Sequence, residues 1–263
     1  MNTPPAAAPD LYSHYTEWKQ WSGAFVVGGK EARYFAAEFR GIPLQGRRLL
    51  EIGFGNGGFL AWARGQGAQV SGIEINDAML EAAQRHGFEA SKATLSELAE
   101  RGEQYDLVAA FDVLEHWDVE ELLQNFGLIR QLLREGGVFL ARFPNGQSPF
   151  GRVFQHGDFS HKSTLSSFKI EYLATATGLE VVRVANARRV PAHTDPLSAL
   201  RQRWLAWRRR RIERRLSRLY GMPRLPLDPN LVAVLRKPGR QDIPATTDDA
   251  TKPGSLEQGG RDG

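Results

Sequence analysis

The stretch Leu49 to Trp62, LLEIGFGNGGFLAW, decides the fold of this chain. An apolar run with one carboxylate is followed by four glycines within six positions, and apolar residues resume at Phe59. This order is typical of a buried parallel strand that turns tightly into a helix, where glycine lets a ligand approach the backbone. We therefore predict a ligand site at this turn rather than a turn that binds nothing.

The glycine spacing fits two ligand classes. Gly53-x-Gly55-x-x-Gly58 matches the dinucleotide fingerprint, whereas Gly53-x-Gly55-x-Gly57 resembles the loop that binds S-adenosyl-L-methionine (SAM) in class I methyltransferases. Glu74 follows at the distance expected for an acid that binds a ribose in either class. A carboxylate at Glu51 is unfavourable beside phosphates but favourable beside the ammonium and sulfonium groups of SAM. Glu51 therefore favours SAM.

Length and composition set broad limits. The 263 residues suffice for one large α/β domain with additional elements, and 41% of them are hydrophobic, enough for a full core. No apolar run is long enough to span a bilayer, and the start, MNTPPAAAPD, lacks the features of a signal peptide, so we expect a cytoplasmic protein. The absence of cysteine excludes disulfides and thiolate metal sites.

Helical and extended patterns alternate along the chain. Strands are expected near 48–52, 70–75, 88–92, 105–111, 138–143, 179–185 and 231–235, with helices between most of them. Asp118-x-x-Glu121 is a capping box for a helix that we expect Gly136-Gly137 to end. This alternation predicts an α/β fold with a doubly wound, mostly parallel seven-stranded sheet.

Composition divides the chain further. Residues 1–10 and 237–263 are polar or rich in Pro and Ala, and we expect disorder there. Residues 11–46 form a predicted helical extension whose aromatic residues recur at helical spacing up to Trp21. The main domain is expected over 47–236, with a basic helical insert over 188–229.

With these motifs, the chain resembles class I SAM-dependent methyltransferases over about residues 47–236. The resemblance rests on the blocks LLEIGFGNG, GIEIN, FDVLEHW and LREGGVFLARFPN, which stand in the expected order. A further stretch, FPNGQSPFG to HGDFSHKSTLSSF, is similar to bacterial methyltransferases of small molecules and cell-surface glycans. The resemblance implies a Rossmann-like fold, SAM as cofactor, and methyl transfer to oxygen of a small molecule or of a cell-surface or lipid-linked glycan.

The resemblance also implies roles for single residues. The methionine part of SAM is expected at Glu51 and the glycine loop, and the ribose at Glu74, with Ile75 beside it. Asp112 and Glu115 are expected to flank the cofactor and the acceptor. The implied cofactor-binding set is Glu51, Gly53, Gly55, Gly57, Glu74, Ile75, Asp112 and Glu115.

Histidines near the expected ligand edge are candidates for the chemistry. Methyl transfer is an in-line displacement in which alignment does much of the work, so a general base is optional, but an oxygen acceptor gains from one. His116 follows the fourth strand and is either such a base or a packing residue at a helix entry. His156, Asp158 and His161 lie on the loop after the fifth strand, where acceptor binding or base action competes with an ordinary polar loop. No tight spacing links these residues into a metal signature, so we expect no metal.

The insert is the second distinctive feature. Eleven arginines against two acids between Arg188 and Tyr220 give this segment a balance of +9, so the rest of the chain carries −5 of the net +4. A helix over 197–220 mixes these arginines with tryptophan and leucine, which suits an anionic membrane surface at the inner face of the membrane, or phosphate-bearing substrates. It also suits RNA, although the Asn/Asp-Pro-Pro-aromatic tetrad of many base-amine methyltransferases is missing. A solvated helix packed by its apolar stripe is the plain alternative.

Three other functions remain open at this point. They are an RNA methyltransferase, a SAM-binding interaction protein without turnover, and an NAD(P)-dependent reductase.

Overall fold

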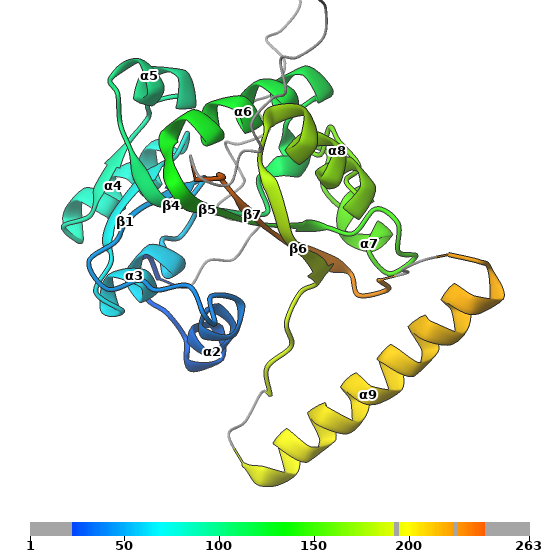
Figure 1. Ribbon diagram of the computed structural model, residues 1–263. Helices are drawn as coiled ribbons and strands as arrows, with labels where there is room; N and C mark the ends of the chain where they lie inside the picture. The colour runs from blue at the N-terminus through cyan, green and yellow to red at the C-terminus, as the bar shows by residue number, and fades with distance from the viewer. Residues whose placement is uncertain (1–22, 192–194, 223–225, 240–263) are drawn as a thin grey trace, which may run out of the picture.

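The computed structural model describes residues 23–191, 195–222 and 226–239. Its centre is one seven-stranded sheet in the order β3-β2-β1-β4-β5-β7-β6 (Figure 1). The predicted doubly wound sheet is confirmed. The strands are β1 Arg48–Ile52, β2 Gln69–Ile73, β3 Glu89–Ser91, β4 Tyr105–Phe111, β5 Leu133–Pro144, β6 Glu180–Asn186 and β7 Asn230–Arg236.

The middle of the sheet is apolar on both faces. β1 pairs in parallel with β2 and β4, and β4 pairs in parallel with β5. Successive strand residues point to opposite faces, and Leu49 and Leu50 accordingly enter two different core clusters. A strand covered on both sides needs a continuous apolar run, and this need explains the run in the opening motif.

Helices cover both faces of the sheet. Residues of α5, α6 and α8 enter the core with Leu50, and residues of α2, α3 and α4 enter the core with Leu49. The helices are α2 Gly29–Glu38, α3 Gly58–Gly65, α4 Asp77–Arg85, α5 Leu95–Glu100, the 3-10 turn η1 Leu114–His116, α6 Val119–Leu132, α7 Arg152–His156, α8 Ser167–Thr177 and α9 Pro196–Leu219.

Local signals placed most of these elements, with three differences, one of which is that α7, the helix that carries His156, lies in a stretch expected to be a loop. The Asp118–Glu121 capping box opens α6 as predicted. However, α6 ends at Leu132, because Leu133 is already extended and pairs with Tyr105 of β4, so the prediction that Gly136-Gly137 ends the helix was wrong. The sequence reading also gave no helix for α5, although it opens on a complete capping box of its own. The aromatic stripe before Gly23 and the tail after Gly239 lie outside the described residues.

The basic insert leaves the sheet at the carboxyl ends of the parallel strands. β7 runs antiparallel to its two neighbours, with Pro144 opposite Asn230 and Asn186 opposite Leu231. The insert therefore begins and ends at the same edge as the turn after β1. Its helix α9 lies apart from the sheet and its covering helices (Figure 1), and no residue within its bounds is buried.

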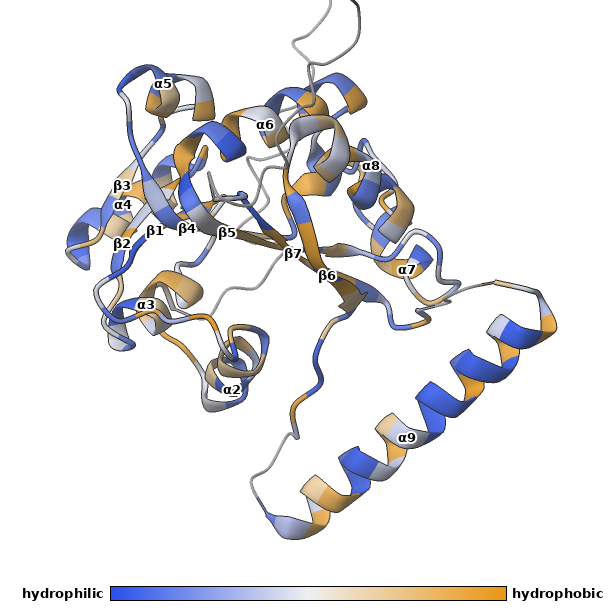
Figure 2. Cartoon of the chain, viewed as in Figure 1, coloured by the Kyte–Doolittle hydropathy of each residue, from blue (hydrophilic) through white to orange (hydrophobic). Residues whose placement is uncertain are grey.

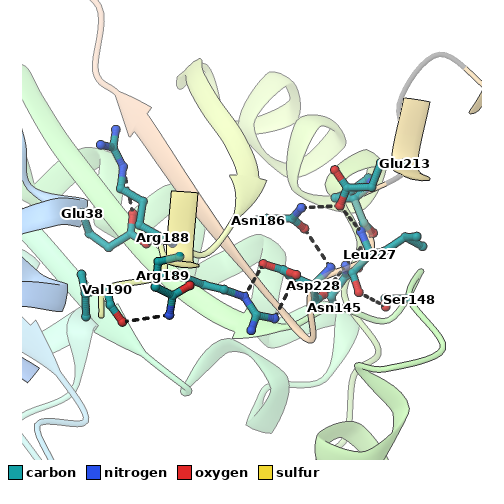
Figure 3. Close-up of polar contacts among 12 residues, drawn as sticks. Glu38, Asn145, Ser148, Asn186, Arg188, Arg189, Val190, Glu213, Leu227 and Asp228 are labelled. Carbon is teal, nitrogen blue, oxygen red and sulfur yellow. Dashed lines mark hydrogen bonds and ion pairs between the residues drawn. The ribbon is translucent and has the colours of Figure 1, made fainter. Parts of the chain in front are cut away.

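Polar contacts hold both ends of the insert to this edge (Figure 3). The Glu213 carboxylate, on α9, accepts hydrogen bonds from Asn186 Nδ2 at 2.6 Å and from the Leu227 backbone N–H at 2.9 Å. Arg189 forms a two-point ion pair with Asp228, at 2.8 and 2.9 Å. These contacts join the first and last residues of the insert to each other. Within the described ranges, every helix is too short or too polar to cross a bilayer.

Candidate active site

The glycine loop after β1 requires glycine at several positions. Gly53, Gly55 and Gly57 have φ angles of +63°, +52° and +73°, a region that disfavours side chains. A Cβ at Gly53 would also lie 2.8 Å from Val113 Cγ2, and one at Gly57 would lie 2.3 Å from the Phe25 ring. The loop is therefore fixed in shape by close neighbours as well as by its backbone angles.

Phe25 is a part of this loop that sequence reasoning missed. Its backbone N–H donates to the Asn56 carbonyl at 2.7 Å, and its ring stacks on Phe88 with the centroids 4.3 Å apart. It also adopts a φ of +57°, unusual for an aromatic residue. A single aromatic residue in an irregular segment carries no periodic signal, so only the structure could place it here.

Glu74 lies against the glycine loop, as predicted for a residue of the same site. One carboxylate oxygen accepts the Gly55 N–H at 2.9 Å, and the other accepts the N–H groups of Ile75 and Asn76 at 2.8 and 3.0 Å. These bonds fix the carboxylate at the carboxyl end of β2. The Ile75 side chain beside it is 58% exposed, available to a ligand on the same surface.

Glu51 is a carboxylate inside the sheet. The Leu60 backbone N–H donates to it, but the other carboxylate oxygen, Oε2, has no hydrogen-bond partner among the residues that the structure describes. Burial, together with the nearby Glu74 carboxylate, raises the pKa of Glu51 well above its usual range. Such a group gains from a cationic ligand that supplies charge and donors at once. Glu51 and the glycine loop thus fit the methionine end of SAM.

Asp112 directly follows β4 and is paired. Arg142 of β5 donates to both of its carboxylate oxygens, with Nε 3.0 Å from Oδ1. Burial works to lower the pKa of Arg142, but Asp112 and Tyr34 together outweigh it through charge and hydrogen bonds, and the pKa is raised. Tyr34 lies beside this pair, and burial raises its pKa to about 12. The Asp112 carboxylate is thus engaged by arginine, and its place beside the cofactor stays a prediction.

A pocket lies between the Asp112–Arg142 ion pair and the two ends of the insert, where the insert joins β6 and β7. Its lining joins α2, β5 and both ends of the insert, and it comprises Tyr34, Arg142, Ala187, Arg188, Arg189, Asp228, Pro229 and Asn230.

Three of the predicted residues around the acceptor form one cluster with Glu115. His161 Nε2 lies 3.9 Å from Glu115 Oε1 and 3.8 Å from Asp158 Oδ2, and the His161 ring meets the His116 ring edge-on at 4.7 Å. Although burial raises it, hydrogen bonds from Ser160 hold the pKa of Asp158 below its usual value. His156 is exposed at the end of α7 and lies outside this cluster.

Two segments far apart in sequence build the cluster. η1 carries Glu115 and His116 past the end of β4, and the loop after α7 returns with Asp158 and His161. The Lys162 and Ser163 backbone N–H groups donate to the Glu115 carbonyl at 2.8 and 3.0 Å, which joins the two segments directly. The sequence placed both at one edge, but it carried no signal that they touch.

Comparison with known protein families agrees with the geometry of the glycine loop. The model of the family described as methyltransferase domain matches residues 29–184, more than half of the chain. The chain belongs to the methyltransferase domain family. This family implies SAM as the methyl donor, and the chemistry of the glycine loop, Glu51 and Glu74 fits it. The match begins within α2, in the segment that the sequence reading set apart as an extension.

Similar sequences in curated proteins cover a smaller part. A ubiquinone biosynthesis O-methyltransferase of Bordetella avium is 42% identical over 81 residues, 28% of this chain and 33% of that protein. One of Azorhizobium caulinodans is 35% identical over 116 residues, 41% of this chain and 45% of that protein. The aligned stretch thus spans less than half the length of these relatives.

Solved structures agree on the fold. A SAM-dependent methyltransferase from Archaeoglobus fulgidus is 18% identical, with a TM-score of 0.57 over 87% of this chain and all of that one. A cyclopropane synthase from Mycobacterium tuberculosis is 16% identical, with a TM-score of 0.54 over 88% of this chain and 95% of that one. At these identities the likeness concerns the fold alone.

The buried carboxylate of this methyltransferase predicts opposite effects on stability and on binding. Glu51→Gln should stabilise the ligand-free protein by about 1–3 kcal/mol near pH 8, because it removes a buried charge with incomplete partners. A raised folded-state pKa means that the wild type loses stability as the pH rises above the ordinary value of 4.5, so the gain should vanish near that pH. Thermal melts at a series of pH values would measure it.

The same variant should bind S-adenosylhomocysteine more weakly, by about tenfold or more, because a neutral amide attracts an ammonium group less well than a carboxylate does. A variant that is less stable at pH 8, or that binds the product as tightly as the wild type, would contradict the role given to Glu51.

Proposed function

We propose that this enzyme transfers the methyl group of SAM to a hydroxyl oxygen of a small, largely apolar acceptor. The observation that carries the proposal is the cluster of Glu115, His116, Asp158 and His161, which lies past the carboxyl ends of β4 and β5. The glycine loop lies past the end of β1, in the same parallel part of the sheet. Parallel sheets of this kind bind their ligands at that edge.

The donor side follows from the residues of β1 and β2. Glu51 and the loop of Gly53, Gly55 and Gly57 would hold the methionine part, and Glu74 with Ile75 the ribose. Bound SAM supplies a methyl group on a positively charged sulfur. The protein holds this end rigidly, because Glu74 accepts three backbone N–H groups that also fix the loop.

The acceptor side needs a group that takes a proton. An oxygen acceptor is a better nucleophile once its proton is removed, and an imidazole near neutrality is suited to removing it. His116 and His161 are the candidates, and the Gln155 carbonyl orients the His161 ring by accepting from Nδ1 at 3.1 Å. The relatives act, by name, in ubiquinone biosynthesis as O-methyltransferases, which favours a hydroxylated ring over a glycan as the acceptor.

Apolar side chains beside the cluster support an apolar acceptor. Phe159, between Asp158 and Ser160, is 97% exposed, and Val153 on α7 is 74% exposed. Phe150 and Phe154 of the same segment are also exposed. Exposed apolar groups gathered in one short segment are typical of a surface that meets an apolar partner. An acceptor with a hydrocarbon tail would cover them.

The two faces of α9 differ, which supports a membrane contact. Its half-buried residues recur at helical spacing and include Gln202, Leu205, Glu213 and Leu216. They form the face on which Glu213 accepts a hydrogen bond from Asn186 of β6. On the exposed side Arg208 lies over the Trp204 ring at 4.8 Å, and Arg211 over the Trp207 ring at 5.4 Å. Figure 2 shows hydrophobic and hydrophilic residues interleaved along this helix.

Tryptophan and arginine side by side suit the boundary between lipid and water, where the ring enters the headgroup region and the cation meets phosphate. We infer that α9 holds the enzyme at an anionic membrane in which the acceptor dissolves. RNA is the rival partner for the same charge.

Calorimetric titration with S-adenosylhomocysteine tests the donor site. The wild type should bind in the micromolar range, and Glu74→Ala should weaken binding at least tenfold, about 1.4 kcal/mol, because ribose hydroxyls lose a charged acceptor. NADH titrated in parallel should give no heat of binding. Silence with S-adenosylhomocysteine, or binding of NADH instead, would overturn the donor assignment.

Transfer of labelled methyl from SAM tests the acceptor class. A phenol that bears a long prenyl chain, presented in detergent, should accept label, and His161→Gln should lower kcat about a hundredfold or more if the cluster removes the proton. A lipid-linked glycan and a bulk RNA preparation serve as comparison acceptors. Label on either of these, with none on the phenol, would contradict the proposed acceptor class.

Flotation with vesicles tests the membrane contact. At low salt the wild type should float with vesicles rich in anionic lipid and stay behind with neutral ones. Each arginine near such a surface contributes about 1 kcal/mol, so replacing Arg208, Arg211 and Arg215 by alanine should weaken binding about a hundredfold. The matched control replaces three exposed arginines outside α9, Arg40, Arg85 and Arg101, and should float like the wild type.

An equal loss in both triple variants would show only an effect of net charge. Binding of RNA that is tighter than vesicle binding, at the same salt, would assign α9 to the rival partner.

A further inference from the structure

We propose that Glu115, His116 and His161 bind one divalent transition-metal cation, with Asp158 supplying a further oxygen. The inference that such a cation binds stands on the geometry of this cluster alone. Its role in the reaction, described below, rests on the proposed function.

The distances within the cluster fit one shared ion. One ligand atom of each of Glu115, His116 and His161 lies within 4.8 Å of the others, and His161 Nε2 is 3.9 Å from Glu115 Oε1. Nitrogen and oxygen ligands lie about 2.0–2.2 Å from a zinc-like ion, so two ligands of one ion are roughly 3–4 Å apart. The three side chains therefore need only small rotations to reach a common centre.

Both histidines are oriented as metal ligands are. His116 Nδ1 lies 3.3 Å from the Ser160 carbonyl oxygen, and His161 Nδ1 lies 3.1 Å from the Gln155 carbonyl oxygen. A carbonyl only accepts hydrogen bonds, so each Nδ1 is the protonated nitrogen and donates. In the neutral rings Nε2 then carries the lone pair. This backbone bond on the far nitrogen is the arrangement that orients histidine toward a metal.

The backbone holds the ligands in place before any ion binds. The bonds of Lys162 and Ser163 to the Glu115 carbonyl join the two segments, and Gln155 Nε2 donates to the Ser163 carbonyl at 3.2 Å. The Glu115 and His161 side chains are only 1% and 8% exposed. A carboxylate withdrawn from water in this way is stabilised by a cation beside it. The cluster is thus both formed and enclosed.

The ligand types indicate which cation. Two imidazoles and one carboxylate suit first-row transition metals and zinc, whereas magnesium and calcium prefer oxygen alone. Three protein ligands and one weaker oxygen leave a coordination position open. If the proposed function holds, the acceptor hydroxyl would occupy that position, and the cation would lower its pKa so that its proton is lost to water. The two histidines would then promote loss of the proton through the cation that they hold, which replaces the direct base action described under the proposed function.

This inference departs from the expectation of metal independence formed on the sequence. His161 stands 45 positions after His116. Metal-binding sequence motifs are recognised by ligands a few positions apart, so no such motif could reveal this pair. The structure supplies the proximity that spacing could not.

Cobalt titration of the full chain tests the proposal. After removal of bound metal with a chelator, Co²⁺ should bind one equivalent per chain and produce visible absorption bands of a site with nitrogen and oxygen ligands. His161→Gln should weaken Co²⁺ binding at least tenfold, because it removes one imidazole ligand. His156→Gln, the same substitution five positions earlier on an exposed residue, should bind Co²⁺ like the wild type. Zn²⁺ should displace the cobalt signal and Mg²⁺ should not.

A folding defect and a failure of the proposed function can both be recognised. Each variant is checked by thermal melting, and Glu115→Gln replaces His161→Gln if the latter does not fold, since it keeps the side-chain shape. S-adenosylhomocysteine binding is measured on the metal-free protein, where it should be retained. Absence of stoichiometric Co²⁺ binding, or equal binding by His161→Gln, would overturn the cation site; loss of S-adenosylhomocysteine binding with the cation retained would overturn the proposed function instead.

Discussion

A carboxylate inside an apolar strand is the constraint on which the donor site depends. Every neighbour of Glu51 in β1 is apolar and buried, and the strand is covered on both faces. Placing an acid there costs folding stability, and the Leu60 N–H and the Arg142 charge recover part of it, as a cationic ligand would. The glycine loop follows one residue after Glu51, and Phe25 and Glu74 hold that loop from either side by contacts with Gly57 and Gly55. The protein thus gives up stability at the residue that we propose binds the donor, as functional sites commonly do.

The proposed acceptor side is formed by loop segments, whereas the proposed donor side is formed at the ends of strands. No strand residue provides it, because the cluster stands on η1 and on the loop after α7, both beyond the ends of the strands. Its precision comes from backbone hydrogen bonds between the two segments rather than from a sheet register. The sheet supplies a rigid edge, and irregular segments bound to one another carry the residues that we propose act on the acceptor. With this arrangement, changes in the loops alone can alter which acceptor binds, while the sheet stays the same.

How far the sequence predicts this structure depends on whether each signal is local. The turn after β1 is predictable because glycine spacing and an embedded acid act within ten residues, and the α6 capping box acts within four. The end of α6 was misplaced because pairing of Leu133 with β4, a tertiary contact, overrode two glycines further on. Phe25 and the contact of Glu115 with His161 were beyond reach, since neither has a periodic or spaced signature. The sequence could name both histidines as candidates but could not bring them together.

The antiparallel pairing of β6 with β7 has a consequence for how the chain can change. Asn186 and Leu231 are partners across the two strands, so the whole insert is one excursion between neighbouring positions of a hairpin. Because α9 buries none of its residues, a shorter or longer excursion leaves both core clusters untouched. The insert can therefore be lengthened, shortened or replaced during evolution while the sheet and its two cores stay the same.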